Sequence, residues 1–401
     1  MDFAMHYTEE QEKFRKEVQE WIKKNAPENM RSPIDGDTRN DAFFAFWREK
    51  HKELGDKGWL HPTFPKQYGG GGLSGEYESI LQEEFIKNQI PGHFSSGQIM
   101  AALVVWGTEE QKQKFLKPLL TGRIGGWQKY TEPQSGTDLA NCQTTAVKDG
   151  DDYILNGSNR FISGVQRPDM IFGPARTDPD APRHRNLGFF MIPFPHPGVE
   201  IVDQKMVNNG AQHFIFLHDA RIPADRLLGG ENQGWQVLNT VMELEHGGRG
   251  VVFPRDDQNE SLIKFMQESK AKGEAVGDNP VLQQATAAAY IDSHINGLFQ
   301  KRNYAYHMDG TEMNWEGPNG ALFTRDFALR NVSRTRDIMG MLAHLGSHDP
   351  RNVHGAVQET FERGSFIRMH GAGSRNINKV IVARRIGISR TKERAATLAS
   401  V

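Results

Sequence analysis

The chain has 401 residues, of which 37% are hydrophobic and 24% are charged, and its formal net charge is -2. This balance fits a globular protein of about two or three domains and gives no sign of the strongly charged surface of a nucleic-acid-binding protein. The single cysteine, Cys142, excludes an intrachain disulfide and a multi-cysteine metal site. Without a signal-peptide pattern or an apolar run of about 20 residues, we expect a cytoplasmic protein with no membrane insertion.

The first part of the chain shows the residue spacing of amphipathic helices. Thr8 precedes the first helix with Gln11 three residues later, which is the spacing of a capping box. Phe14, Val18 and Trp21 then recur on one helical face. Further helices are expected at 42–59, 75–88 and 108–122.

Beyond Gly125 the sequence changes to short β-rich runs. Asp149-Gly150 and Asn156-Gly157 are strong turn signals between such runs. Closely spaced short strands of this kind predict a small barrel or sandwich. The expected strands lie within 144–164, 187–194, 198–202 and 213–223.

Helical periodicity returns near residue 232 and continues to the end of the chain. Long helices joined by short loops are typical of a bundle. The sequence therefore predicts an N-terminal α-helical domain (1–124), a central β-barrel domain (125–231) and a C-terminal helical bundle (232–401). The helices of the bundle are expected at 281–307, 320–345, 353–369 and 375–386.

The segment VLNTVMELEHGGRG (237–250) carries two glutamates two positions apart. On a helix Glu245 shares a face with apolar residues, whereas Glu243 falls on the polar face. An apolar setting raises the pKa of a carboxyl group, which suits a general base near neutral pH. An ion pair between Glu245 and Arg249, one turn later, is the alternative that the spacing leaves open. The apolar residues on the face of Glu245 are Trp235, Leu238, Val241 and Met242.

Several segments, in the right order, resemble the acyl-CoA dehydrogenase family of flavoenzymes. YTEPQSGTDLA (130–140) resembles the Thr-Glu-Pro-x-x-Gly-Ser-Asp signature, with Thr137 in place of Ser. ARIPADRLLGGENQGW (220–235) and HGAGSRNINKVIVARRIG (370–387) are similar to two later signatures. The resemblance implies an α+β multidomain fold with an N-terminal helical domain, a central β-barrel and a C-terminal four-helix bundle. It also implies FAD as cofactor and an acyl-CoA thioester, oxidised to the 2,3-enoyl-CoA, as substrate.

The resemblance also indicates where the catalytic base lies. Many members carry it in a C-terminal Tyr-Glu-Gly-Thr run, but here Gly371 occupies the first position of that run and Ala372 that of the glutamate. Isovaleryl-CoA dehydrogenase and similar members supply the base from the helix after the barrel, where this chain has MELEH (242–246). Both the helical face and the resemblance therefore select Glu245 as the base. The resemblance further implies substrate contacts from Thr137, His246, Ala372 and Gly373, with a backbone N–H of Ala372 or Gly373 binding the thioester oxygen.

For the flavin, the resemblance implies an aromatic wall at Phe161 and a hydroxyl near N5 at Ser163, because RFISG occupies the Trp-x-Thr position of the family. A barrel-core aromatic is the alternative interpretation of Phe161. The remaining FAD contacts implied by the resemblance are Gln128, Tyr130, Thr131, Thr137, Ser374 and Asn376.

Two segments depart from the family pattern. The usual Arg-x-x-Phe-Gly and Gln-x-x-Gly-Gly-x-Gly runs, which hold the FAD adenylate across subunits, are replaced by QESKAKGEAVGDNP and GMLAHLGSHDP. The resemblance implies a homo-oligomer (a dimer or a homotetramer) and an electron-transfer flavoprotein as acceptor. The two departures favour a hetero-oligomer as an alternative and a bulky or cyclic acyl group.

Other functions are weighed against this one. A flavin monooxygenase or oxidase on the same fold and a non-catalytic partner subunit of a hetero-oligomeric dehydrogenase are the rival interpretations. A group of polar residues near the C-terminal end has partial metal-ligand spacing, but solvated or capping roles are favoured and no metal is expected. These residues are His344, His348, Asp349 and His354.

Overall fold

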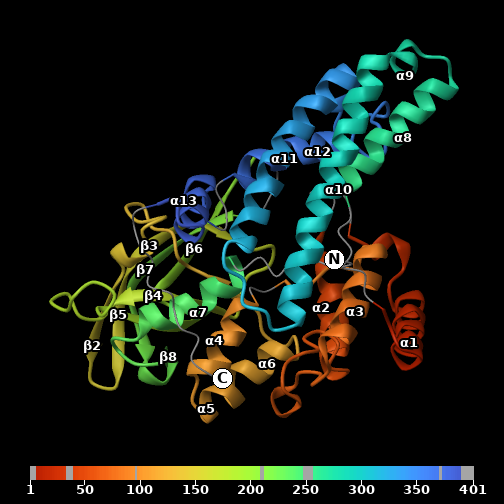
Figure 1. The fold of residues 1–401 in the computed structure, drawn as a ribbon. Helices are drawn as coiled ribbons and strands as arrows, with labels where there is room; N and C mark the ends of the chain where they lie inside the picture. Colours follow the sequence, from red (N-terminus) through yellow and green to blue (C-terminus); the bar gives the residue numbers. More distant parts are fainter. Residues whose placement is uncertain are drawn as a thin grey trace. The chain divides into compact units, whose positions relative to one another are not determined.

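The computed structural model describes residues 6–32, 39–94, 97–207, 212–246, 256–369 and 373–389, and within these ranges the side chains of 243–246 and 368 are not described. The chain divides into two compact units, of which one is Met5–Glu245 and the other contains His246–Val401. Figure 1 shows helices and a twisted sheet in the first unit and helices alone in the second. None of the helices in the described ranges is long and apolar enough to cross a membrane.

The first helix begins at the predicted capping box. The Thr8 hydroxyl accepts a hydrogen bond from the Gln11 N–H (3.3 Å), and the Gln11 side chain accepts one from the Thr8 N–H (2.8 Å). The buried face of this helix, which includes Val18 and Trp21, is the predicted one. The helical elements before the sheet are α1 (Glu9–Asn25), η1 (Glu28–Met30), α2 (Asp41–Asp56), η3 (Lys66–Tyr68), α3 (Gly75–Lys87), α4 (Gln98–Trp106), α5 (Glu109–Gln111), η4 (Lys112–Leu116) and α6 (Lys117–Leu120).

Eight strands form one sheet in the order β6-β7-β3-β2-β4-β5-β8, with β1 paired to β4. Within the described residues the two ends of this path are not paired, so the predicted closed barrel is not shown. The inward side chains of the sheet form a core that includes Trp127, Phe190 and Ile215. The strands are β1 (Gly126–Gln128), β2 (Thr145–Asp149), β3 (Asp152–Ser163), β4 (Met170–Arg176), β5 (Leu187–Pro193), β6 (Val199–Gln204), β7 (Gln212–Pro223) and β8 (Leu227–Leu228). Two short turns, η5 (Leu139–Asn141) and η6 (Ala224–Arg226), accompany them.

One of the two predicted turns is confirmed and the other is wrong. Asp149 ends β2, and Gly150 has a φ of 63° in the tight connection to β3. Asn156 and Gly157, by contrast, lie inside β3 at a register shift against β7. Gly157 is required there for close packing, because a Cβ atom at this position would lie 2.4 Å from the Thr144 hydroxyl oxygen.

Helix α7 (Gly234–His246) follows the sheet and packs against it within the first unit. Its residues Val237, Leu238 and Val241 are buried in a core that also contains Phe172 and Met191 of the sheet. The predicted boundary at 231/232 assigns α7 to the C-terminal domain, whereas the compact first unit extends to Glu245.

The second unit is the predicted helical bundle. Helix α8 contacts α10 and α12, and α11 contacts the same two helices, so four helices surround one core. Leu262, Phe265 and Ile338 are buried in that core. The elements are α8 (Asp257–Ala271), α9 (Ala275–Asp278), α10 (Pro280–Met308), α11 (Glu316–Met339), η7 (Gly340–His344), α12 (Val357–Arg368) and α13 (Arg375–Arg385), the last packed on α11.

Candidate active site

Phe161 lies on the outer face of the sheet, near the end of β3. Its neighbours Asn159 and Ile162 are buried, whereas the Phe161 side chain is 47% exposed. A register shift of β3 against β7 spans these residues, and Phe161 itself has a φ of 59°. Bulges of this kind redirect a side chain. Phe161 is therefore a surface aromatic and not the barrel-core aromatic of the alternative interpretation.

Ser163 is held at the end of β3 by the packing of the next residue. A Cβ atom on Gly164 would lie 2.0 Å from the Trp127 ring, so only glycine allows this approach. Trp127 stacks on His213 with ring centroids 4.4 Å apart, and the His213 Nε2 lies 2.8 Å from the Gly164 carbonyl oxygen. The Gln212 amide donates a weak hydrogen bond to the Ser163 hydroxyl (3.5 Å). Ser163 thus lies on a rigid support.

The Tyr-Thr-Glu-Pro segment is fixed by a buried carboxylate. Glu132 is 2% exposed and accepts hydrogen bonds from the Gln143 N–H (2.5 Å), the Thr144 N–H (2.9 Å) and the Thr144 hydroxyl (2.5 Å). The carbonyl of the preceding Thr131 accepts the Arg160 N–H (2.9 Å). Glu132 therefore has a structural role, because its oxygens are occupied by the chain itself. Glu132 ties this loop to the segment just before β2, and the bond from Arg160 to Thr131 ties it to β3.

The other flavin contacts implied in the first unit surround this loop. Gln128 ends β1 and is half-buried, and Tyr130 is half-buried against the core that holds α4 and α7. Thr137 is exposed on the loop that follows. Gln128, Tyr130, Thr131, Phe161 and Ser163 come from β1, β3 and the segment after β1, and the backbone bond from Arg160 to Thr131 joins these two regions.

A charged residue lies inside the sheet next to these positions. Lys129 is 0% exposed, and its ammonium group donates to the Pro174 carbonyl (2.7 Å). Burial lowers the pKa of Lys129, with opposing contributions from Cys142 and Glu132. Burial also raises the pKa of the Cys142 thiol to about 12, so this cysteine is an inert thiol.

The proposed base and its neighbour lie in the last turn of α7. Glu245 and His246 belong to the helix, but their side chains are outside the described residues. The predicted inner face is largely confirmed up to that point: Leu238 and Val241 are buried, Trp235 and Met242 are half-buried, and Gln236 on the other face is exposed.

The C-terminal contacts belong to the second unit. Ser374 is the N-cap of α13, where its hydroxyl accepts the Ile377 N–H (3.3 Å). Asn376 is exposed in the first turn of that helix, and Gly373 has a φ of 76°. Ala372 lies outside the described residues.

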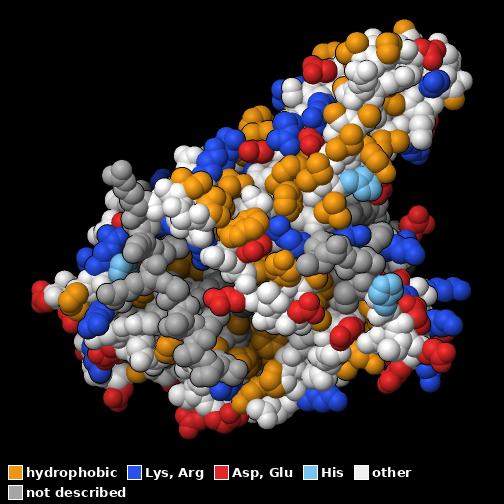
Figure 2. All heavy atoms as spheres, viewed as in Figure 1, with side chains coloured by type: hydrophobic (Ala, Val, Ile, Leu, Met, Phe, Trp, Pro, Cys, Tyr) orange, Lys and Arg blue, Asp and Glu red, His pale blue; other side chains and the backbone are white. Residues whose placement is uncertain are grey.

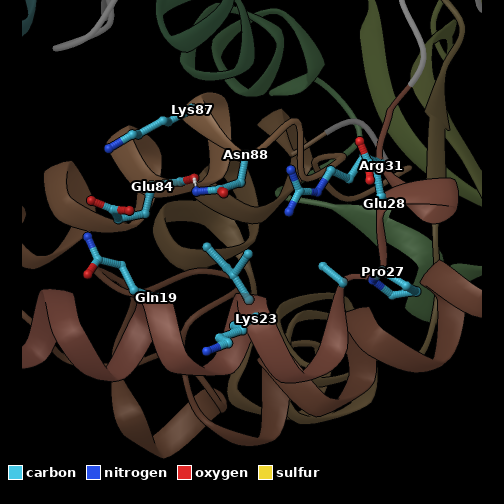
Figure 3. A pocket seen from close by; sticks show the side chains of 10 residues that line it. Gln19, Lys23, Pro27, Glu28, Arg31, Glu84, Lys87 and Asn88 are labelled. Atoms are coloured by element: carbon cyan, nitrogen blue, oxygen red, sulfur yellow. Dashed lines mark hydrogen bonds between the residues drawn. The ribbon is translucent and has the colours of Figure 1, made fainter.

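Two cavities of about 360 Å³ occur in the first unit, and neither coincides with the predicted flavin contacts. Figure 3 shows the first one, with Gln19 and Lys23 of α1 on one side and Glu84 and Lys87 of α3, with the C-cap Asn88, on the other. Glu84 is already paired with Arg15 (3.1 Å). The second cavity opens on β3 and β7, where Ser158, Phe216 and His218 line it together with Gln134.

Three of the four polar residues with metal-ligand spacing have another partner. His344 pairs with Glu362 (3.2 Å), and Asp349 accepts from the Arg351 guanidinium (2.8 Å). His354 lies 3.4 Å from Glu268. In the described part of the chain no group of three or more His, Cys, Asp or Glu residues is arranged to hold a metal ion.

Sequence reasoning missed several residues on the outer face of β3 and β7. The Arg160 guanidinium lies over the Phe161 ring, 5.1 Å from its centroid, and donates to the Pro133 carbonyl (3.2 Å). Phe214 and Phe216 also point to this face, because the alternate residues Ile215 and Leu217 are buried. The pattern of HFIFLHDARIP (213–223) predicted a strand, and its alternation could have identified these two rings as a pair on one face.

Comparison with known proteins agrees with this architecture. The model of the acyl-CoA dehydrogenase N-terminal domain matches residues 8–123, and that of the acyl-CoA dehydrogenase middle domain matches residues 128–217. Acyl-CoA dehydrogenase FadE26 of Mycobacterium tuberculosis (strain ATCC 25618 / H37Rv) is 25% identical over 389 residues, which are 94% of this chain and 96% of that protein.

Two solved structures share the fold. The ChsE4-ChsE5 complex from Mycobacterium tuberculosis has a TM-score of 0.79 at 24% identity, over 97% of this chain and 100% of that one. A protein described as the Tcur3481-Tcur3483 steroid ACAD has a TM-score of 0.81 at 23% identity, over 98% and 100%. At this identity the likeness concerns the fold alone.

The chain belongs to the acyl-CoA dehydrogenase family. Members of this family are flavoproteins that oxidise CH–CH bonds of acyl-CoA thioesters. The predicted family and enzyme class are therefore confirmed, and so is the predicted fold class apart from the closure of the barrel.

Proposed function

We propose that this chain catalyses the FAD-dependent α,β-dehydrogenation of an acyl-CoA thioester, with Glu245 as the base that removes the α-proton. The observation that carries the proposal is the direction of the buried face of α7. Its buried positions are Gly234, Val237, Leu238 and Val241.

The phase of the helix separates the two glutamates. At ~100° per residue, position 245 falls within ~30° of the centre of the buried face, whereas position 243 falls ~170° away from it. A carboxylate on the apolar side is disfavoured in its charged form, which raises its proton affinity toward that of a neutral-pH base. The sequence resemblance supports the same residue.

The outer face of β3 fits a flavin. Phe161 offers an exposed ring as a wall, and Ser163 offers a hydroxyl two residues later on a support fixed by Trp127. The Gln212 side-chain oxygen on the same face is buried and has no hydrogen-bond partner in the described part of the chain, so it can accept from a bound N–H group. When bound here, FAD would accept the β-hydrogen as hydride at N5.

Residues of the chain would carry out proton removal and stabilise the developing negative charge. Glu245 takes the α-proton, and a backbone N–H of Ala372 or Gly373 donates to the thioester oxygen as negative charge develops there. The sequence resemblance also assigns Ser374, the N-cap of α13, and Asn376 to the cofactor. Gln128, Tyr130, Thr131 and Thr137 would bind the flavin edge, and His246 and Thr137 the CoA moiety.

We also propose that the substrate carries a bulky acyl group and that the protein is an oligomer. One solved structure of the same fold is described as a steroid ACAD, and another as a complex of two named proteins. Helix α10 has 29 residues but few buried ones, and Figure 2 shows hydrophobic side chains on the surface of the helical bundle. Val281, Ile291 and Leu298 are exposed there, which favours burial against another subunit. We expect an electron-transfer flavoprotein to accept the electrons.

The test compares Glu245→Gln with Glu243→Gln in the flavin-loaded protein. The base proposal predicts that Glu245→Gln retains FAD but bleaches it with an acyl-CoA at least ~100-fold more slowly under anaerobic conditions. Glu243→Gln should bleach at the native rate, since position 243 lies on the opposite face. A panel of short, branched, aromatic and steroid acyl-CoAs tests the substrate class in the same assay. Equal rates for both variants would rule out Glu245 as the base.

A further inference from the structure

The cavity between α1 and α3 has an apolar floor and a volume of about 360 Å³. Ile22 of α1 and Ala26, the residue that ends this helix, line the floor, and both are buried. Pro27 extends it toward η1. The volume is at the lower end of the roughly 300–1,000 Å³ of small-molecule sites, so it suits a compact ligand with a short apolar body. None of the residues that line this cavity is a predicted flavin or substrate contact.

Arg31 points its guanidinium group into this cavity, as Figure 3 shows. The Nε atom of Arg31 is buried and has no hydrogen-bond partner within the described residues. A buried donor without a partner costs free energy, and most such groups in proteins are satisfied. The planar guanidinium group matches the two oxygens of a carboxylate, to which it donates two parallel hydrogen bonds. A bound carboxylate would therefore satisfy Arg31.

The backbone on both sides of Arg31 is fixed to other elements. The Trp47 indole N–H, from α2, donates to the Met30 carbonyl (2.5 Å). The Ser32 N–H donates to the Gln89 carbonyl, just after the end of α3 (2.7 Å). Trp47 is completely buried, so the first of these bonds is shielded from water. Because the cationic residue starts from a fixed backbone, less conformational freedom is lost when a ligand binds to it.

The charges around the cavity favour an anion with a single charge. Lys23 and Lys87 line the cavity but are exposed, so water screens their ammonium groups. The carboxylate of Glu84 is already paired with Arg15 (3.1 Å), and that of Glu28 is exposed. The guanidinium group is thus the cation that a ligand inside the cavity would contact. One guanidinium group balances one carboxylate, whereas a phosphate carries up to twice that charge and has no apolar body for the floor.

We propose that this cavity binds a small organic carboxylate with a short apolar body. The Arg31 guanidinium group binds the carboxylate, and Ile22 and Ala26 contact the apolar part. All the lining residues belong to α1, η1, α3 and the residues next to them, within the first unit. Binding there does not depend on the flavin, so the site is additional to the proposed function and can be tested separately from it.

The test measures the binding of four probes to the full-length, flavin-loaded protein by calorimetry. We expect benzoate to bind with a Kd of about 0.01–1 mM, a range that compact ligands of about ten non-hydrogen atoms reach. Benzamide has the same shape without the charge, acetate lacks the apolar body, and inorganic phosphate is an anion without one. Each of these three should bind at least about tenfold more weakly than benzoate. This comparison uses the unmutated protein and does not depend on the folding of a variant.

Two variants place the ligand. Arg31→Gln should raise the Kd for benzoate by about 10-fold to 100-fold, because it removes charge-assisted hydrogen bonds. Lys24→Gln removes the same charge from an exposed position of α1 that does not line the cavity, and it should leave the Kd within about twofold. Equal losses in both variants would indicate attraction by the general surface charge and would overturn the site.

Other results would also overturn the carboxylate site. These are a Kd for benzoate that Arg31→Gln leaves unchanged, equal affinity for benzoate and benzamide or phosphate, and no benzoate binding below about 10 mM. Benzoate that shifts the flavin absorption spectrum and binds equally well to Arg31→Gln would lie at the flavin instead. A protein that takes up no FAD would contradict the proposed function, and the same titrations would still test the cavity.

Discussion

Replacing Gly157 by alanine tests the close packing that holds the Tyr-Thr-Glu-Pro loop. An added Cβ would lie 2.4 Å from the Thr144 hydroxyl oxygen and 2.9 Å from the Cα of the same residue. Gly157 does not have a positive φ, so backbone strain is not involved. Thr144 cannot easily move, because its N–H and hydroxyl both bind the buried Glu132.

The magnitude follows from these contacts. Overpacking of a tight core costs about 1–3 kcal/mol, and loss of the hydrogen bond from the Thr144 hydroxyl to a carboxylate costs about 1.5–3 kcal/mol. We expect Gly157→Ala to lower the unfolding free energy by about 2–4 kcal/mol and the Tm by roughly 2–5 °C, as measured by thermal and urea unfolding. Gly136→Ala is the matched control, since its Cβ would meet only the Thr131 methyl group at 3.7 Å.

A double-mutant cycle isolates the clash. Thr144→Ala removes the hydroxyl that the new methyl group strikes, so the double variant should lose less stability than the sum of the two single variants. A difference of at least about 1 kcal/mol is expected for residues in direct contact. Strictly additive losses, or a Gly157→Ala protein as stable as Gly136→Ala, would refute the steric reasoning.

Two other substitutions test buried titratable groups. Because burial lowers the pKa of Lys129, the unfolded chain binds more protons than the folded one, and stability should rise with pH toward the pKa of the unfolded lysine. Lys129→Met should flatten this dependence and stabilise the protein at pH 7 in urea titrations, and a less stable variant would contradict it. Burial lowers the pKa of His51 from 6.5 to about 4, so unfolding takes up a proton below pH 6.5. His51 should contribute roughly 3 kcal/mol to the loss of stability between pH 6.5 and 4, and His51→Phe should reduce the loss by about that amount; an unchanged loss would contradict this.

The fold was predictable where local patterns match the packing. The capping box predicted at Thr8 and the helix start expected at residue 108 are both confirmed, and the side-chain bonds at Thr8 and Thr108 are formed entirely within one turn. The long bundle helices were also found from their spacing. Helix α4 was missed because QIMAALVVW has no polar face to reveal its period.

The turn predicted at Asn156-Gly157 failed for a reason outside the local sequence. Position 157 must be glycine because Thr144 packs against it too closely for a Cβ atom. Thr144 lies 13 positions earlier in the chain and contacts Gly157 only after β2 and β3 have paired. A short-range signal cannot distinguish a glycine that permits a turn from one that permits close contact between neighbouring segments.

The sequence predicts the functions of several site residues, but it does not predict the contacts that these residues make. A resemblance of motifs selects Phe161, Ser163 and Glu245, but it does not reveal that Glu132 is fully occupied by Gln143 and Thr144. The positions of Arg160 and Phe216 on the outer face of the sheet were not predicted. They depend on the register of β3 against β7, which pairs residues about 50 positions apart.

The division of the chain between Glu245 and His246 has a consequence for protein engineering. A chimera joined at this point to the helices of a relative would inherit the candidate base and the aromatic wall from one parent, and Ser374 and Asn376 from the other. A single crossover in one helical turn would then separate the proposed base and flavin wall from the proposed contacts of the second unit.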